Sequence, residues 1–307
     1  MPRKIQPAVQ TMEFNLVASS APRYLDLSAA ASIANRRFYR QGLNWAVAGF
    51  TIIAQPTSSG TITFSKLPNT WVCSNSWEKG FRAWKRQQDE ALEEGDQESV
   101  KGRYNDFKIY ADPEHSVTAS PHYLYPVDLN GVDFSAPEEW LYSQVVVPND
   151  LGVVGATDEY TLHMVGGDTV GNSRSLIQAY SDSRSTPQSP DPATPGAASV
   201  GLYTDMFNVG MDSSEVVANA EFRNNELPYD QDNYPGGANN AGTMEIMNQI
   251  ILNPASTIPG KYSLSGSNVP CGLVRIDAPL VDQPFQLFVH MVPGDHRGYM
   301  ASPMQDM

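Results

Sequence analysis

Two clusters of basic side chains, each interleaved with aromatic rings, give this sequence its clearest chemical signature. The basic residues are Arg36, Arg37, Arg40, Lys79, Arg82, Lys85 and Arg86. The rings among them are Phe38, Tyr39, Phe81 and Trp84. Cations neutralise phosphates and aromatic rings stack on bases, so this mixture suits single-stranded nucleic acid. Together with Arg3 and Lys4 near the N-terminus, the basic residues are our candidate nucleic-acid contacts.

The competing interpretation of these clusters is structural. Phe81 and Trp84 also fit the buried stripe of a helix, and a dedicated nucleic-acid binder would not usually carry a net charge of −14. The charge is unevenly spread. Residues 1–110 hold fourteen Lys/Arg and ten Asp/Glu, a net of +4, whereas residues 111–307 hold six and twenty-four, a net of −18. This asymmetry predicts one face that tolerates polyanions and one that repels them, with chance clustering as the alternative.

Candidate metal ligands are few. Glu226, Asp230 and Asp232 lie in the stretch ELPYDQDNY and could hold a hard cation through oxygen atoms, although a proline-anchored surface loop is the favoured interpretation. His290 and His296 form an H-x₅-H pair without a cysteine or a third histidine nearby. His163 and His290 fall within apolar strands, where we expect hydrogen-bonded structural histidines.

Catalytic motifs are missing from the sequence. No phosphate-binding glycine loop follows a strand, and no complete nucleophile elbow is present. We therefore predict that the chain is not an enzyme and carries no cofactor. Cys73 and Cys271 fit no metal or redox pattern, and two buried free thiols are favoured over a disulfide because no secretion signal is seen. No window approaches the roughly 20 apolar residues of a membrane span.

The strand predicted over Leu43–Gln55 is the element around which the other elements are arranged. Leu43, Trp45, Val47 and Ile53 fall on one side of it, and Ala46, Ala48, Phe50 and Ile52 on the other. A strand that is apolar on both faces lies inside a sandwich or beneath a neighbouring layer. A turn at Pro56–Gly60 then leads to an alternating strand at Thr61–Ser65, and together they predict a hairpin.

Further strands follow at intervals along the chain. They are predicted at Met12–Ser19, Asp106–Tyr110, Tyr123–Val127, Trp140–Val147, Tyr160–Val165, Ser175–Tyr180, Gly201–Met206, Thr243–Leu252, Tyr262–Ser265, Cys271–Ala278 and Phe285–Val292. Thr243–Leu252 is either a strand or a short helix, and the adjacent Ile250 and Ile251 favour a strand. Turn signals such as Asn130-Gly131 and Gly166-Gly167 separate these segments.

Two segments show helical patterns. Ser28–Asn35 is rich in alanine and can form a turn or two capped by Asp26 or Ser28. The stronger helix is predicted at about 75–94, with Asn75 and Glu78 as a capping box. Its buried stripe consists of Trp77, Phe81, Trp84, Gln88 and Ala91/Leu92.

The charges of the stronger helix run from basic to acidic, which opposes the helix dipole. This order suggests a partner or a second copy of the chain. The alternative is a solvated helix with ion pairs four residues apart, such as Lys85–Asp89 and Arg86–Glu90.

This count of elements predicts an all-β protein. A single jelly-roll sandwich of about eight core strands, with one inserted helix at about 75–94 and long loops, fits the strand count. Residues 1–12 are expected to form a flexible arm, residues 13–300 one domain, and residues 301–307 a polar tail. Two long polar runs, Ser181–Ser199 and Glu221–Gly242, are expected to be surface loops of that domain.

Three stretches resemble capsid proteins of small circular single-stranded DNA viruses that encode a replication initiator. They are FYRQGLNWAVAGFTI (Phe38–Ile52), NTWVCSNSWEKGFRAWKR (Asn69–Arg86) and ELPYDQDNYPGG (Glu226–Gly237), about a seventh of the chain. The resemblance implies a jelly-roll subunit that assembles inside the host cell into an icosahedral virion shell of sixty copies or a multiple of sixty. It also implies a viral genome of single-stranded DNA on the inner face, and a host receptor that the sequence leaves open.

The chain departs from that family at its N-terminus. Many such capsid proteins begin with a long Arg-rich arm, whereas this arm offers only Arg3 and Lys4. Under the capsid interpretation the inner surface takes its positive charge from the two basic clusters, or cations assist packing, and the acidic second half faces outward and between subunits.

Two other interpretations of the chain remain open. The first is a carbohydrate-binding or attachment sandwich that uses exposed aromatic residues: Trp140, Tyr142, Tyr229 and Tyr234. The second is a hydrolase that uses scattered carboxylates.

Overall fold

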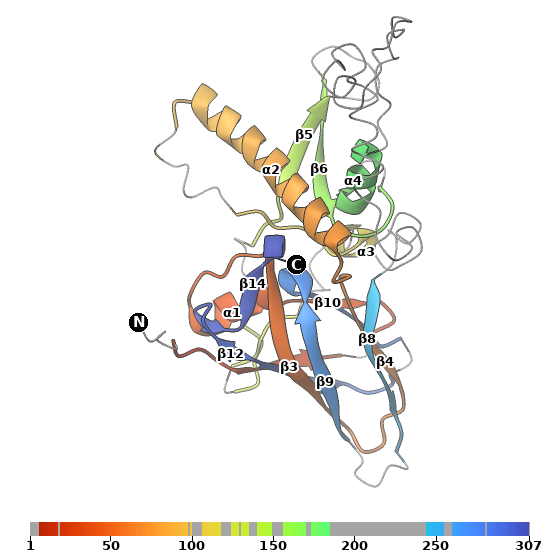
Figure 1. Ribbon diagram of the computed structural model, residues 1–307. Coiled ribbons are helices and arrows are strands. Elements are labelled where there is room, and N and C mark those ends of the chain that lie inside the picture. The colour runs from red at the N-terminus through yellow and green to blue at the C-terminus, as the bar shows by residue number, and fades with distance from the viewer. Residues whose placement is uncertain are drawn as a thin grey trace, which may run out of the picture.

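The computed structural model describes residues 6–17, 19–97, 99, 106–117, 124–128, 130–134, 140–148, 156–169, 173–184, 244–254, 260–279 and 281–306. Within these residues the chain forms two facing antiparallel sheets, and a second group of elements lies beyond one end of them (Figure 1). The N-terminal segment begins beside the sheets, and the C-terminus lies where the two groups meet.

The first sheet is centred on β3. Its strands are β1 (Thr11–Leu16), β11 (Phe285–Met291), β3 (Leu43–Ala54), β9 (Lys261–Val269) and β14 (Ala301–Pro303). Strand β11 joins β1 to one side of β3, and β9 and β14 also pair with β3. All these pairs are antiparallel. Because β11, β9 and β14 all pair with β3, β3 is the central strand of this sheet, as the sequence predicts.

The second sheet runs in the order β2-β10-β4-β8. Its strands are β2 (Arg23–Asp26), β10 (Leu273–Asp277), β4 (Gly60–Lys66) and β8 (Glu245–Leu252). The inner faces of the two sheets enclose one apolar core, whose largest buried side chains include Phe14, Leu25, Trp45, Phe50, Ile52, Ile62, Phe64 and Leu287. The prediction of a mainly β protein is confirmed, and the segment at Thr243–Leu252 is a strand.

A bulge in β3 corrects the prediction that both of its faces are covered. The register with β11 shifts between His290 and Met291, so Ala48 is an extra residue that turns the strand. Val47 before the bulge and Phe50 after it therefore both point into the core, whereas Ala48 is exposed. Trp45 and Val47 of one apolar set therefore share the buried face with Phe50 and Ile52 of the other, whereas Ile53 is exposed.

The predicted hairpin between β3 and β4 is also wrong. The two strands do not pair with each other, because β3 lies in the first sheet and β4 in the second. Residues 55–59 carry the chain from one sheet to the other, and each strand finds its partners much later in the sequence.

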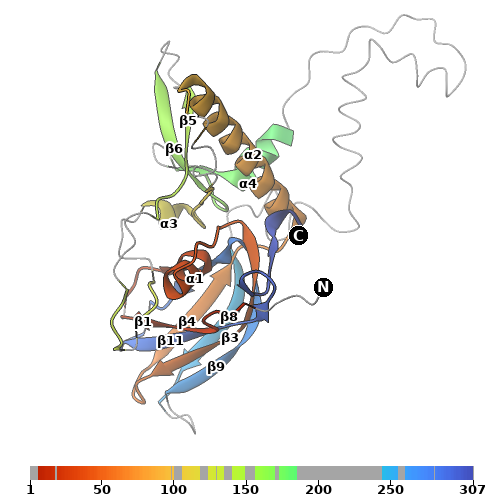
Figure 2. The same ribbon diagram turned by 90° about the vertical axis from the view of Figure 1, so that its left-hand side faces the viewer.

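The chain between β4 and β8 forms an insertion rather than the single helix that the sequence predicts. In its described residues the elements are α2 (Trp71–Glu94), α3 (Pro113–Val117), β5 (Gln144–Pro148), β6 (Thr157–His163), β7 (Ser173–Ser175) and α4 (Leu176–Arg184). The insertion lies beyond one end of the sandwich, with α3 between the two groups (Figures 1 and 2). It has a second apolar core, which also includes Tyr24, Cys271, Leu273 and Met304 from the sandwich side.

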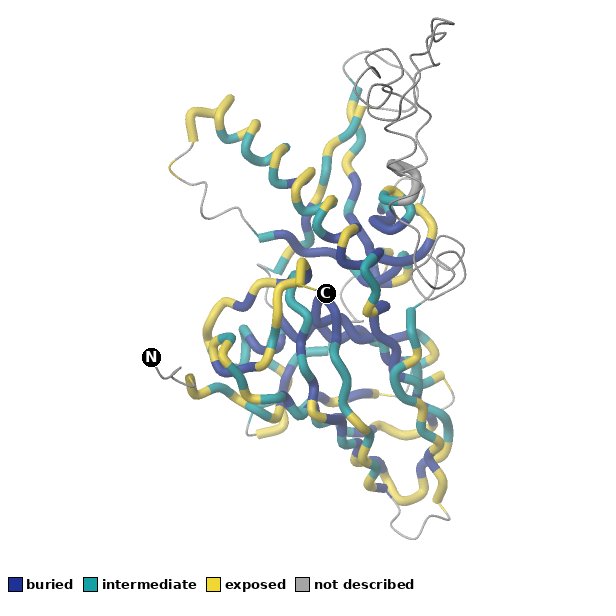
Figure 3. Tube along the Cα trace, in the orientation of Figure 1, coloured by how far each residue is buried: buried dark blue, intermediate teal, exposed yellow. Residues whose placement is uncertain are grey.

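Helix α2 begins four residues earlier than predicted. Thr70 is its N-cap, and the Thr70 hydroxyl accepts a hydrogen bond from the Cys73 backbone amide at 3.4 Å. The first turns bury Val72 and Trp77, and the stripe continues to Trp84. Beyond Trp84 the helix projects away from the sandwich, and its residues are exposed or only partly buried (Figure 3). The predicted cap at Asn75 is therefore wrong, because Asn75 is an exposed residue inside the helix.

The shorter helix matches its prediction. Helix α1 (Leu27–Asn35) begins at Asp26, whose carboxylate accepts hydrogen bonds from the backbone amides of Ser28 and Ala29. Other short elements are η3 (Pro270–Gly272), η4 (Met304–Asp306) and the small pair β12 (Pro293–Gly294) and β13 (Gly298–Tyr299).

Several predicted strands take another form. Asp106–Tyr110 and Tyr123–Val127 contribute only isolated bridges, at Tyr110 and Val127. Most of Ser175–Tyr180 belongs to α4. The predicted strand at Gly201–Met206 lies outside the described residues, as do the polar run 221–242 and all but the first four residues of the run 181–199.

Both ends of the chain are more ordered than the sequence predicts. Thr11 and Met12, placed in the flexible arm, already belong to β1. The expected polar tail is corrected too, because residues 301–303 pair with β3 and Met304 is fully buried against the second core.

Candidate functional site

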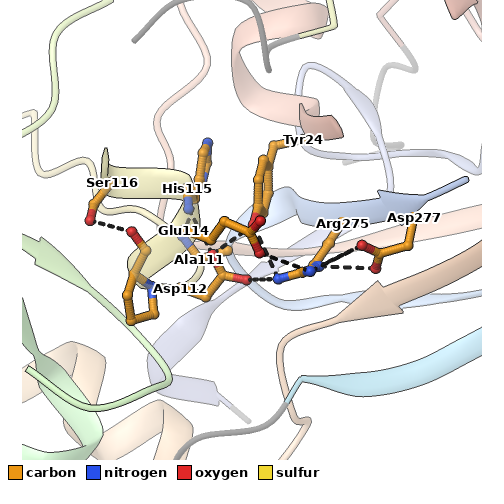
Figure 4. A network of polar contacts seen from close by, with 9 residues as sticks. Tyr24, Ala111, Asp112, Glu114, His115, Ser116, Arg275 and Asp277 are labelled. Carbon is orange, nitrogen blue, oxygen red and sulfur yellow. Dashed lines mark hydrogen bonds and ion pairs between the residues drawn. The ribbon is translucent and has the colours of Figure 1, made fainter. Parts of the chain in front are cut away.

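A network of charged groups joins the insertion to the sandwich, with Arg275 of β10 at its centre (Figure 4). The guanidinium contacts Asp112 at 2.7 Å, Glu114 at 3.0 Å and Asp277 at 2.9 Å. Asp112 and Glu114 belong to the insertion, whereas Asp277 follows Arg275 on the same face of β10. One cation therefore holds three carboxylates, two of which come from the other side of the junction.

Tyr24 and His115 complete this network. The Tyr24 hydroxyl donates to Asp112 at 2.7 Å, and its ring stacks on the His115 imidazole with centroids 4.0 Å apart. His115 Nδ1 accepts from the Ala111 amide at 3.0 Å, and Asp112 also accepts from the His115 amide at the start of α3. These contacts fix α3 directly against β2 and β10.

The surroundings of Arg275 and Tyr24 fix the protonation states of both side chains. Burial opposes the charge of Arg275, but its hydrogen bonds to Asp277 and Asp112 outweigh burial and raise the pKa of Arg275. Burial, reinforced by the negative charge of Asp112, raises the pKa of Tyr24 and keeps its hydroxyl protonated. The arrangement is suited to holding the insertion on the sandwich.

A second polar group lies beside the first, around the buried carboxylate of Asp26. Gln41 donates to Asp26 at 3.0 Å, and the Trp140 indole donates to it at 3.3 Å. Gln41 also binds both the amide and the carbonyl of Ile109, which ties the sandwich to the 106–111 segment. Lys108 covers the Trp140 ring, with its ammonium nitrogen 4.5 Å from the ring centroid.

Asp26 makes stability depend on pH. Burial raises its pKa from 3.8 to about 6, because the hydrogen bonds it accepts only partly compensate for lost hydration. Because the pKa of Asp26 is higher in the folded chain than in the unfolded chain, the protonated carboxyl group stabilises the fold. This contribution is complete below about pH 3.8 and is lost as the pH rises through about 6. Asn at this position keeps the cap without the charge.

We therefore expect Asp26→Asn to gain stability relative to the natural chain as the pH rises. Chemical denaturation of both proteins at pH 4.5 and pH 7.5 should show the difference in unfolding free energy shifting by about 2 kcal/mol in favour of the variant. A difference that is the same at both pH values would contradict the assignment of an uncompensated buried charge.

The structure separates the two predicted basic clusters. The first follows α1 on the sandwich. The Arg36 guanidinium lies 5.5 Å from the Phe134 ring centroid, Arg37 donates to the Pro7 carbonyl, and Arg40 lies 3.7 Å from Asp106. These contacts are at the surface, and Arg40 remains 62% exposed.

The second basic cluster lies on α2 in the insertion. Arg82 pairs with Glu78 and Arg86 with Glu90, each four residues apart, so the predicted Arg86–Glu90 pair is confirmed. Lys79 lies over the Tyr180 ring, and Lys85 is partly exposed. Exposed pairs of this kind contribute little to stability, so a phosphate can compete for either arginine. Arg3 and Lys4 lie outside the described residues.

The cysteines and histidines considered as candidate site residues lie in positions that indicate structural roles. Both cysteines are free and fully buried, as predicted, and burial raises the pKa of Cys73 to about 12. His290 lies between the Thr11 and Thr51 hydroxyls at 3.1 and 2.9 Å, whereas His296 packs near Tyr39 and Trp45. The described residues contain no cluster of three metal-binding side chains. The proposed cation ligands Glu226, Asp230 and Asp232 lie outside them.

One serine–histidine contact has the spacing of a nucleophile and its base. Ser173 Oγ lies 2.9 Å from His163 Nδ1 and 2.9 Å from Ser116 Oγ. Ser173 and His163 are fully buried, however, and burial lowers the pKa of His163. This contact therefore packs the second core and is closed to a substrate, in line with the structural histidine predicted at His163.

The aromatic side chains considered for sugar binding are engaged at the junction. Trp140 is half-buried between Asp26 and Lys108, and Tyr142 stacks on Tyr110 with ring centroids 3.9 Å apart. Tyr229 and Tyr234 lie outside the described residues.

Sequence reasoning missed the Arg275 network. Arg275 and Asp277 are two residues apart in an alternating strand, which does place them on one face. Asp112-Pro113 reads as a turn signal, although Asp112 instead caps α3. What brings these groups together is the packing of segments more than 160 residues apart.

Comparisons with known proteins found no matching family model, no matching curated protein and no matching solved structure. In the described part of the chain, none of the helices combines the length and apolar character needed to cross a membrane.

Proposed function

We propose that this chain is a structural capsid subunit that assembles into a closed icosahedral shell around a nucleic acid, most simply the single-stranded DNA that the sequence resemblance suggests. In this proposal the chain is not an enzyme, its main partner is itself in many copies, and it functions in a virion assembled inside a host cell. The observation that carries the proposal is the order in which the sandwich strands pair.

Eight of the nine sandwich strands, all except β14, pair from the outside of the sequence inward. β1 pairs with β11, β2 with β10, β3 with β9 and β4 with β8. Successive pairs alternate between the two sheets. This nested order supports the assignment of a jelly roll, an architecture used by viral capsids, lectins and cupins.

Two further features favour a shell subunit among these classes. The interior of the sandwich is filled by large side chains such as Trp45, Phe50 and Phe64, which leaves the outer surfaces for binding. The two basic clusters lie on separate surfaces that a nucleic acid can contact without displacing buried groups. Fold alone does not fix function, so the proposal depends on a direct test of assembly.

Light scattering of the purified full chain, over a range of protein and salt concentrations, tests this proposal. We expect particles far larger than one chain, with an onset of assembly that shifts with salt because each copy carries a net charge of −14. A stable monomer at every protein and salt concentration would overturn it, and glycan binding would then be the next property to measure.

A further inference from the structure

Among the described residues, another segment of the chain covers one open side of the sandwich but not the other. At the β1/β2 side, the Leu124 amide donates to the Tyr24 carbonyl and the Val127 amide donates to the Glu13 carbonyl. The 124–134 segment therefore covers the edges of both strands. At the opposite side lies β8, which among the described residues pairs with β4 alone.

In the part of the chain that the structure describes, this edge strand is uncovered, and it is long and apolar. β8 has eight residues, and the side chains of Ile246 and Ile251 are 65% and 70% exposed. Edge strands are normally protected by lysine, proline or a cover, because their free amides and carbonyls pair readily with another strand. β8 contains neither lysine nor proline, and its only charged residue is Glu245 at the end. Its one register irregularity, at Met247, leaves residues 248–252 in regular pairing with β4.

The edge is also held in place. The Asn248 side chain donates to the Ser265 carbonyl at 3.0 Å and accepts from the Ser265 hydroxyl at 3.3 Å. These bonds link β8 to β9 across the gap between the two sheets. A strand that is already fixed loses little further conformational entropy when a partner strand pairs with it.

We infer that β8 is a contact between two copies of this chain, which pair their β8 strands antiparallel about a twofold axis. This inference adds one contact to the assembly proposed above.

The sequence of β8 is what selects a second copy as the partner. Residues 246–251 read Ile-Met-Asn-Gln-Ile-Ile, which is apolar at both ends and polar in the middle in either direction. Antiparallel strands related by a twofold axis place the residue at the axis opposite its own copy, so an axis at Gln249 pairs Met247 with Ile251 and Ile246 with Leu252 of the other copy. Gln249 then faces Gln249 of the other copy, and only the pair of Asn248 with Ile250 combines a polar with an apolar residue, so the strand largely complements itself.

The net charge of the chain determines how this contact depends on salt concentration. Each copy carries a net charge of −14, which opposes the approach of a second copy at low salt. Apolar burial and backbone hydrogen bonds are short-ranged and little affected by screening, so the contact should strengthen as salt rises.

The first test uses sedimentation velocity on the full chain and on the variant Ile251→Lys. Val132→Lys is the matched control, because Val132 is 61% exposed on the segment that covers the opposite side of the sandwich. We expect the dissociation constant of the smallest oligomer to rise at least tenfold in Ile251→Lys and to stay unchanged in the control. Equal association of all three proteins would overturn the contact.

The second test keeps the inference testable if the lysine variant fails to fold. Gln249→Cys should form a disulfide-linked dimer under mild oxidation, whereas Val132→Cys should not, and the natural cysteines are fully buried. Shells that form without this cross-link would overturn the β8 contact and leave the proposed function standing. A protein that stays monomeric under all conditions would overturn both.

Discussion

Replacing Arg275 by methionine is expected to lower the free energy of unfolding by about 2–4 kcal/mol. Asp112, whose side chain is only 9% exposed, would then keep its charge without the guanidinium that compensates for it. Methionine retains much of the volume, so the loss reports the charge rather than a cavity. Chemical denaturation of the full chain at neutral pH measures the effect.

Two further variants show whether this loss comes from Asp112. Glu114→Gln is the control, because Glu114 is 52% exposed and its contact with Arg275 should contribute less than about 1 kcal/mol. Adding Asp112→Asn to Arg275→Met removes the uncompensated charge and should recover part of the loss. The assignment of the Arg275 network as the link that holds the insertion on the sandwich would fail if Arg275→Met were as stable as the natural chain.

Gly266→Ala is expected to destabilise the sandwich by about 3 kcal/mol or to prevent folding. Gly266 lies on β9 opposite the bulge of β3, where an added methyl carbon would overlap the backbone of Val47 and Ala48. Backbone atoms cannot move aside as a flexible side chain can, so the β3–β9 pairing itself must shift. Thermal or chemical denaturation of the variant measures the effect.

The control for this substitution is Gly167→Ala. Gly167 has no atom within 4 Å of the position that a methyl carbon would take, so the same change should alter stability by less than about 0.5 kcal/mol. The contrast tests one of the four nested strand pairs on which the jelly-roll assignment depends. Two variants of equal, near-natural stability would contradict the close approach of β3 and β9.

Local sequence patterns predicted correctly the elements whose burial follows a regular period along the chain. Strand β11 alternates from Phe285 to Met291 and is buried on alternate residues, as expected of a strand with one face in the core. The start of α2 was misplaced because both Thr70 and Asn75 can cap a helix, and only the burial of Val72 and Cys73 decides between them. Ser175–Tyr180 is too short for its apolar pattern to separate a strand from a helix.

Long-range features could not be predicted from the sequence. The bulge at Ala48 is set by the pairing of β3 with β11, so the sequence shows two apolar faces where the fold has one. The Arg275 network joins three segments whose proximity follows from the packing of the insertion on β2 and β10. That the basic clusters contact nucleic acid stays a prediction, and only the fold shows that the two clusters lie on different parts of the molecule.

Imaging of the purified full chain by negative-stain electron microscopy tests the central claim most directly. The sample should be prepared at the protein and salt concentrations that give the largest particles in solution. A shell-forming subunit predicts closed particles of uniform diameter. Fields that contain only single subunits or irregular aggregates, under all conditions in which the chain is folded, would contradict the proposal that this protein is a capsid subunit.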